Sequence, residues 1–317
     1  MKGKRRNSGK RRLAACPCVA VAILSVLALL PSYGGGAERL IDTCWMWGHE
    51  TGQVDGAPKN HWNLPPATND YPMVDGCASF GVKNLCCIRW DRPGKAFRDT
   101  LAGMRQVSFP ASSCEGTEKG FLKLADWCFE TAKEMPNMTA IDFDDFFRPV
   151  DAPQPAALPL ERLREIRRRA DAFGRKIELR VVMYDEMFLP GSVRRYRTDA
   201  EHGRVLRPYL DQFDAVSYWT WHAAHLKYLP ENFAKIRKLT RGKRLLMGVY
   251  LWDFGPSKPM RVEPLAGQLA FALEKWKSHE IDGLIFLCSS ICNRDFPTVA
   301  YARQWLRDHC NDERDAR

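Results

Sequence analysis

Short apolar runs alternate with amphipathic stretches along most of this chain. The amphipathic stretches repeat their apolar positions with helical spacing, at residues 117–135, 159–173, 198–213, 231–240, 263–279 and 297–309. The apolar runs have the length of buried strands, at residues 40–47, 84–90, 105–109, 139–143, 176–184, 215–221, 243–251 and 283–289. Strands that alternate with helices of this length predict right-handed βαβ units and a parallel sheet.

The number and character of these units favour a closed sheet. Nearly continuous apolar strands indicate a sheet that is covered on both faces. Eight uninterrupted units favour closure into a barrel, and the first predicted strand is not followed by the GxGxxG pattern of an open dinucleotide-binding sheet. The sequence therefore predicts an α/β fold, a single (β/α)8 TIM barrel over residues 38–317.

The N-terminal segment has a different pattern. A basic stretch is followed by an apolar run at 19–30 and by the small residues 34–37, which is the order of a secretory signal peptide. We expect cleavage near Ala37, with an uncleaved anchor that also uses residues 13–18 as the alternative. The predicted localisation is secreted or periplasmic, with membrane contact only through this segment during export.

The charge balance follows from the same segment. The chain has a net charge of +10, and the first 36 residues hold seven basic residues and no acidic one. Their removal leaves 10 − 7 = +3, an ordinary balance that gives no indication of a nucleic-acid partner.

Cysteines give limited information. Those inside predicted strands are expected to be free and buried, namely Cys44, Cys86, Cys87 and Cys288. Those outside strands are candidates for disulfides in an oxidising compartment, namely Cys77, Cys114, Cys128, Cys292 and Cys310. No CxxC pair has zinc-site spacing, and we predict neither a metal nor another cofactor.

Acidic residues gather at the ends of the predicted strands, which is where barrel enzymes place their active sites. Hydrolysis of a glycosidic bond needs one carboxyl to protonate the leaving oxygen and another to attack or to activate water. The preferred pair is Asp144 or Asp145 with Glu186, and Asp253 is the reserve partner. The alternative is structural: Asp142 would pair with Arg180 inside the barrel, and Asp145 would cap a loop.

Aromatic residues also fall at strand ends. Tryptophans suit the apolar faces of sugar rings, although packing in the core is the alternative for each of them. Trp45 and Trp90 are among the tryptophans at the predicted strand ends. The residues predicted to bind substrate are Trp47, His49, Arg89, Asp142, Tyr184, Trp219, Trp221, His222, Tyr250 and Trp252.

The stretch Ile141-Asp142-Phe143-Asp144 resembles the DxxDxDxE strand of the family 18 chitinases. More broadly, the chain resembles secreted (β/α)8 glycoside hydrolases over roughly residues 40–309. Phe146 stands where the chitinases have their catalytic Glu, and Thr139 where they have the first Asp. The resemblance therefore implies the barrel and a carbohydrate substrate, but not the chitinase mechanism.

Two other functions fit the same residues. A divalent-metal-dependent sugar isomerase or epimerase would use Asp144, Asp145, Glu186 and His222 as hard-metal ligands. A catalytically inactive barrel that only binds glycans is the second alternative. Export and the tryptophans at the strand ends favour a glycosidase.

Overall fold

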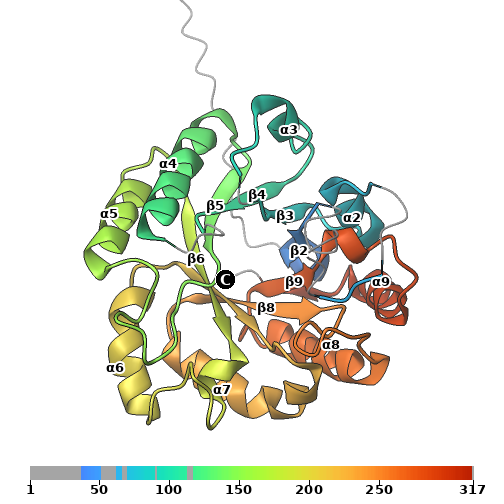
Figure 1. Ribbon diagram of the computed structural model, residues 1–317. Coiled ribbons are helices and arrows are strands. Elements are labelled where there is room, and N and C mark those ends of the chain that lie inside the picture. The colour runs from blue at the N-terminus through green and yellow to red at the C-terminus, as the bar shows by residue number, and fades with distance from the viewer. Residues whose placement is uncertain (1–36, 51–61, 66–69, 90, 113–116, 316–317) are drawn as a thin grey trace, which may run out of the picture. The chain divides into compact units, whose positions relative to one another are not determined.

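The computed structural model describes residues 37–50, 62–65, 70–89, 91–112 and 117–315, all within one compact unit. Eight parallel strands close into a barrel in chain order, as Figure 1 shows. They are β2 (Cys44–Gly48), β3 (Asn84–Cys87), β4 (Gln106–Pro110), β5 (Met138–Phe143), β6 (Glu178–Tyr184), β7 (Ala215–Trp219), β8 (Arg244–Tyr250) and β9 (Gly283–Leu287). The predicted closure is confirmed, because β2 pairs with β9 through Trp45 and Ile285.

Helices surround the barrel (Figure 1). They are α2 (Met73–Phe80), α3 (Lys95–Asp99), α4 (Glu118–Glu134), α5 (Leu160–Asp171), α6 (Asp199–Leu210), α7 (Leu229–Leu239), α8 (Val262–Lys277) and α9 (Pro297–His309). Threonine hydroxyls cap two of them, since Thr117 accepts from the backbone N–H of Gly120 and Thr198 from that of Glu201. No helix among the described residues combines the length and the apolar character that crossing a membrane requires.

The first predicted strand is too long. Its first half is the short helix α1 (Leu40–Thr43), and only the second half joins the barrel as β2. The Thr43 hydroxyl donates to the Leu40 carbonyl at 2.8 Å, which stabilises this turn. An apolar run alone cannot separate a buried helical turn from a strand, and this is the cause of the error.

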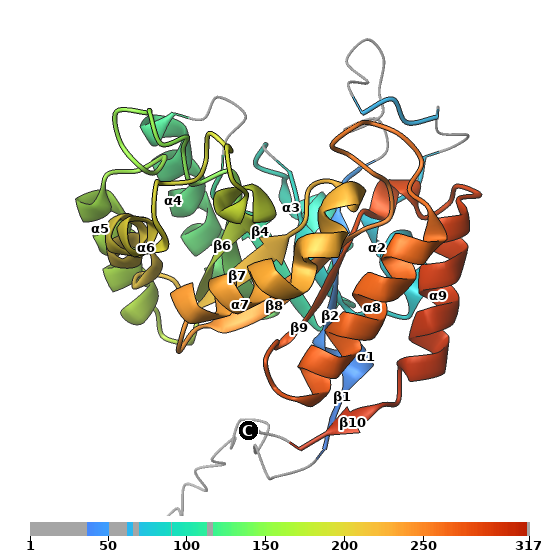
Figure 2. The ribbon, with the colours of Figure 1, turned by 90° about the horizontal axis from the view of Figure 1, so that it is seen from below.

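A small antiparallel ribbon lies at the N-terminal end of the barrel strands (Figure 2). It pairs β1 (Glu38–Arg39) with β10 (Glu313–Arg314). Arg314 is buried, donates to the carbonyls of Trp276 and Ile281 at 2.7 Å, and forms an ion pair with Glu38. The ribbon therefore ties the C-terminal segment to α8 and to the start of the barrel.

An ion pair occupies the middle of the barrel. Arg180 on β6 donates to Asp142 on β5 at 2.8 and 3.0 Å, and each side chain is only 1% exposed. The Ser108 hydroxyl donates to the same carboxylate, and the Arg180 guanidinium lies 4.2 Å from the ring centroid of Trp45. The predicted inward direction of Arg180 and Asp142 is confirmed.

The cysteine predictions are confirmed in part. Cys44, Cys86, Cys87 and Cys288 are free and buried as expected. The disulfide prediction is wrong for Cys77, Cys128, Cys292 and Cys310, which are free thiols, while Cys114 lies outside the described residues. Burial raises the pKa of the Cys77 thiol to about 12, which keeps it in its neutral form.

Candidate active site

The end of β5 carries two adjacent carboxylates in different surroundings. Phe143 and Phe146 are fully buried on either side of them and meet edge to face at 5.7 Å. Between these two buried rings, Asp144 is half-buried and Asp145 is exposed at the end of the strand. Asp145 has a φ of 48°, a left-handed conformation that Asp tolerates better than most residues. The turn thus directs the two carboxylates to the C-terminal mouth of the barrel.

Asp144 has an unusual carboxyl group. Burial raises its pKa to about 7, and the negative charge of Asp145 adds to the effect. One Asp144 oxygen accepts from the Tyr184 hydroxyl at 3.2 Å and from the Asp145 backbone N–H at 2.9 Å. These two hydrogen bonds oppose the rise but do not cancel it. The Asp144 carboxyl is therefore divided between its protonated and ionised forms near neutral pH.

A third carboxylate follows β6. Glu186 lies on the short helix η1 (Asp185–Phe188) and is 3.5 Å from the Arg194 guanidinium. Arg194 also donates to the Phe147 carbonyl at 2.8 Å, which fixes it beside the end of β5. The sequence does not reveal the position of Arg194, because its arginine-rich loop gives no sign of which guanidinium turns inward.

The Tyr250 hydroxyl is affected by the negative charges of the carboxylates at the strand ends. Tyr250 ends β8 and is 5% exposed. Its pKa is raised well above the ordinary value, first by burial and then by nearby negative charges, those of Asp144, Asp145, Asp185 and Glu186. Tyr250 is therefore close enough to these four carboxylates to respond to their negative charge.

Asp185 organises the loop after β7. Its buried carboxylate accepts from the Trp221 backbone N–H at 2.9 Å and contacts His225 Nδ1 at 2.8 Å. Burial raises the Asp185 pKa, and these two contacts oppose the rise. Asp185 was not among the predicted site residues, whereas its neighbour Glu186 was. The structure makes Asp185 the residue that positions Trp221.

Trp221 is the aromatic residue that best fits a substrate-binding role. It is half-buried and lies between Tyr184 and Tyr250, with ring centroids 5.9 and 5.6 Å away. Trp62 lies 5.4 Å away, and Phe254 6.4 Å away on a tilted plane. Trp62 and Phe254 were not predicted, because they lie on loops where no periodicity marks the direction of a side chain.

The other tryptophans pack beneath the mouth. Trp47 is 3% and Trp219 is 1% exposed, and their rings meet edge to face at 5.3 Å. Trp219 lies against the backbone of Gly248, where a Cβ would be 2.0 Å from the indole ring. Trp252 is 2% exposed, lies 5.1 Å from Phe296 and donates from its indole nitrogen to a loop carbonyl. Trp47, Trp219 and Trp252 are therefore packed in the core, which was the alternative to substrate binding for each of them.

Several predicted residues lie apart from the carboxylates. Asp142 is enclosed in its ion pair with Arg180, as the structural alternative stated. Arg89 forms ion pairs with Glu50 and Asp91 at the end of β3. Trp90 is outside the described residues.

Three more predicted residues support loops. The buried carboxylate of Asp253 accepts from the Ala223 backbone N–H at 3.0 Å. The backbone N–H and carbonyl of buried His49 both bind the Ser289 hydroxyl. His222 is half-buried and packs against Gly255, where a Cβ would be 2.2 Å from the imidazole. None of these contacts involves the carboxylates at the end of β5.

Solved structures share this architecture. A putative α-L-fucosidase from Bacteroides thetaiotaomicron is 10% identical with a TM-score of 0.57, covering 92% of this chain and 99% of its own. A chitinase active domain from Pyrococcus furiosus is 13% identical (TM-score 0.49; 86% and 98% covered). The PgaB (BpsB) glycoside hydrolase domain from Bordetella bronchiseptica is 10% identical with a TM-score of 0.48, covering 86% of this chain and 99% of its own. This chain shares the (β/α)8-barrel fold with the putative α-L-fucosidase.

The likeness at such low identity concerns the fold. No protein-family model matches the chain, and the curated proteins include no significant match in sequence. Phe146 stands where the family 18 chitinases have their catalytic Glu. Its ring is buried in an aromatic cluster with Phe121 and Phe213 and does not reach the mouth of the barrel. Asp144 and its neighbours must therefore be judged on their own geometry.

A divalent-metal site would need several of the predicted ligands to lie close together. Within the described part of the chain, no three His, Cys, Asp or Glu side chains form a group that could hold a metal ion. The set Asp144, Asp145, Glu186 and His222 therefore does not come together as a metal site in this structure.

Proposed function

We propose that this protein is a hydrolase of glycosidic bonds and that Asp144 is its general acid. The supporting observation is the Asp144 carboxyl, whose pKa of about 7 lies far above the ordinary value. A carboxyl that retains its proton near neutral pH can deliver it to the glycosidic oxygen as the bond breaks. The hydrogen bond from Tyr184 holds the carboxyl in one orientation for this transfer.

Glu186 is the proposed second carboxylate. Glu186 follows β6, the strand beside β5, whereas Asp145 is adjacent to Asp144 in sequence and is more exposed than Glu186. Carboxylates on neighbouring strand ends can approach a sugar from opposite sides, as either hydrolytic mechanism requires. The ion pair with Arg194 restricts the orientation of the Glu186 side chain, which in this proposal attacks the sugar or activates water.

The proposed substrate is a carbohydrate. The half-buried ring of Trp221 and the Tyr250 ring beneath it offer an apolar surface beside the carboxylates. Such a surface suits the C–H face of a sugar, while the acids contact its polar atoms. The putative α-L-fucosidase that shares the fold supports the same class of reaction.

The test compares Asp144→Asn and Glu186→Gln with the unchanged protein on polysaccharides and aryl glycosides. We expect each variant to lose about 10²-fold or more in turnover while its melting temperature stays close to that of the unchanged protein. Asp308→Asn on the exposed face of α9 is the matched control and should keep full activity. Normal turnover per folded molecule, together with a lowered melting temperature, would show that the cluster is structural.

The same assay separates the alternatives. Activity that disappears with a chelator and returns with a divalent cation would favour the sugar isomerase or epimerase. Binding of a glycan without turnover under any condition would identify a glycan-binding barrel. Turnover that a chelator does not affect supports the proposed hydrolase.

A further inference from the structure

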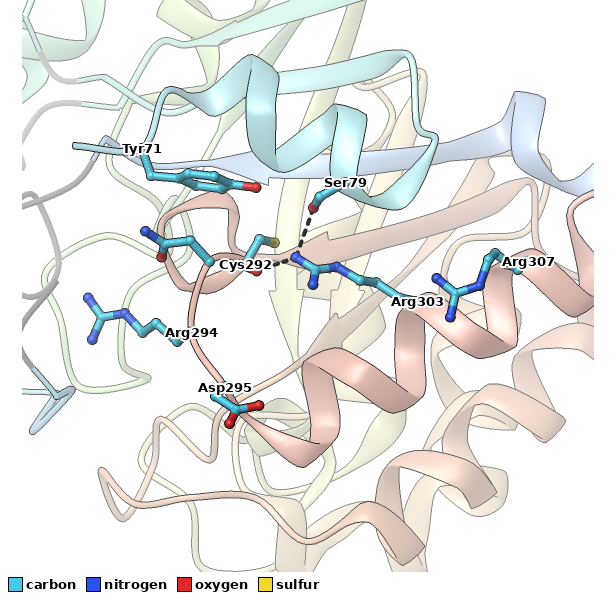
Figure 3. A pocket seen from close by; sticks show the side chains of 8 residues that line it. Tyr71, Ser79, Cys292, Arg294, Asp295, Arg303 and Arg307 are labelled. Atoms are coloured by element: carbon cyan, nitrogen blue, oxygen red, sulfur yellow. Dashed lines mark hydrogen bonds between the residues drawn. The ribbon is translucent and has the colours of Figure 1, made fainter. Parts of the chain in front are cut away.

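A cavity of about 600 Å³ lies away from the carboxylate cluster, beside α2, α9 and the segment between β9 and α9 (Figure 3). Three guanidinium groups and one carboxylate line it, a balance of 3 − 1 = +2. The charged residues are Arg294, Arg303, Arg307 and Asp295, and Tyr71 and Ser79 add hydroxyl groups. The cavity is thus polar and positively charged.

Two of these arginines lie one turn apart on α9. Arg303 and Arg307 are four residues apart and extend along the same side of the helix in Figure 3. Like charges at this spacing repel each other and destabilise a helix. A ligand of opposite charge would remove this repulsion.

The contacts of both arginines are with neutral oxygens. Arg303 donates to the Ser79 hydroxyl at 3.1 Å and to the Cys292 carbonyl. Arg307 donates to the side-chain oxygen of Gln304 at 3.2 and 2.5 Å. No carboxylate of the described residues forms an ion pair with either guanidinium, so their charges are available to an anion.

The Arg303 guanidinium is held ready for such a ligand. Ser79 and Cys292 fix one end of it, and the Phe80 ring lies 5.4 Å from its centre. Its Nε atom is buried and has no hydrogen-bond acceptor within the described chain. A donor fixed in this way loses little conformational entropy when an acceptor arrives.

We propose that this cavity binds an anionic small molecule through a sulfate, phosphate or carboxylate group. A guanidinium donates two parallel hydrogen bonds to such oxyanions, and a volume of about 600 Å³ suits a small organic ligand. The proposal does not depend on the hydrolase activity.

The test is calorimetric titration of the full chain with four probes: inorganic phosphate, sulfate, glucose 6-phosphate and glucuronate. We expect at least one probe to bind and Arg307→Gln to weaken its binding by about tenfold, the value of one charge-assisted contact. Arg303→Lys, which keeps the charge but loses the planar fork, should also weaken it. Binding of the sugar-linked probes alone would indicate an organic anion, and binding of the inorganic ions would indicate a free oxyanion.

Arg162→Gln is the matched control. Arg162 is a half-exposed arginine on α5, across the barrel from α9, and it pairs with Glu165. Its replacement should leave the affinity unchanged. The proposal is overturned if none of the four probes binds, or if Arg162→Gln weakens binding as much as Arg307→Gln, which would indicate a response to overall charge.

Discussion

Three aspartates within four residues at the end of β5 have three different environments. Asp142 is enclosed in an ion pair, Asp144 is half-buried beside a hydroxyl, and Asp145 is exposed. Environment decides whether a carboxyl serves as a structural anion or as a proton donor. The sequence predicted the cluster and offered both readings, but it could not assign them. The assignment depends on Arg180 and Tyr184, which are distant in the chain.

The first residue-scale prediction concerns pH. The Asp144 pKa of about 7 in the folded protein exceeds its value of 3.8 in a model peptide, so the folded state holds a proton that the unfolded state releases. The stability from this group is therefore complete below pH 3.8 and is lost as the pH rises towards 7. We expect Asp144→Asn to remove this loss. Urea unfolding of both proteins between pH 4 and 7 measures it, and parallel pH curves would contradict the raised pKa.

The second residue-scale prediction concerns the buried ion pair. Asp142→Asn leaves the Arg180 charge buried without its counter-ion and should reduce the free energy of unfolding by about 3–5 kcal/mol. The exposed pair of Asp126 with Arg169 is the control, and Asp126→Asn should cost about 1 kcal/mol or less. Denaturant unfolding curves at neutral pH compare the two. A similar small loss in both variants would show that water reaches the barrel interior.

At the scale of elements, the longer units were predictable and the short ones were not. The six predicted helices and eight strands all occur, because buried strands and amphipathic helices leave clear patterns. The helices α1, α2 and α3 span four, eight and five residues, too few for a helical period to be evident. Trp47 and Trp219 occur at strand ends as predicted, but a position at a strand end carries no information on how deeply a side chain is covered.

Gly248 on β8 leaves the space into which the Trp219 ring is buried. Gly248→Ala would place a methyl group about 2.0 Å from the Trp219 indole, so the ring or the strand must move. We expect a loss of about 1–3 kcal/mol in the free energy of unfolding, and a change in Trp fluorescence. Gly267→Ala on α8 is the control, since its Cβ would meet nothing within 4 Å and alanine favours a helix. An unchanged Gly248→Ala protein would show that the lumen is more loosely packed than the contacts indicate.

At the scale of the whole molecule, the order of charged, apolar and small residues before Glu38 leads us to propose export. We expect the protein recovered from its native host to begin near Glu38. Intact mass and N-terminal sequencing of the soluble protein provide the measurement. Recovery of a soluble product that still contains residues 1–30 would contradict the proposal.

The ribbon of β1 with β10 brings Glu38 and Arg314 side by side, at the end of the barrel opposite to the mouth (Figure 2). Without residues 1–36, a short peptide linker could therefore join the two ends of the barrel into a circle. New termini could then be opened in an outer loop, giving a circular permutant with the same strand order around the barrel. A fusion partner attached beside this ribbon would also leave the C-terminal mouth of the barrel unobstructed, which makes the ribbon the preferred site for immobilising the protein.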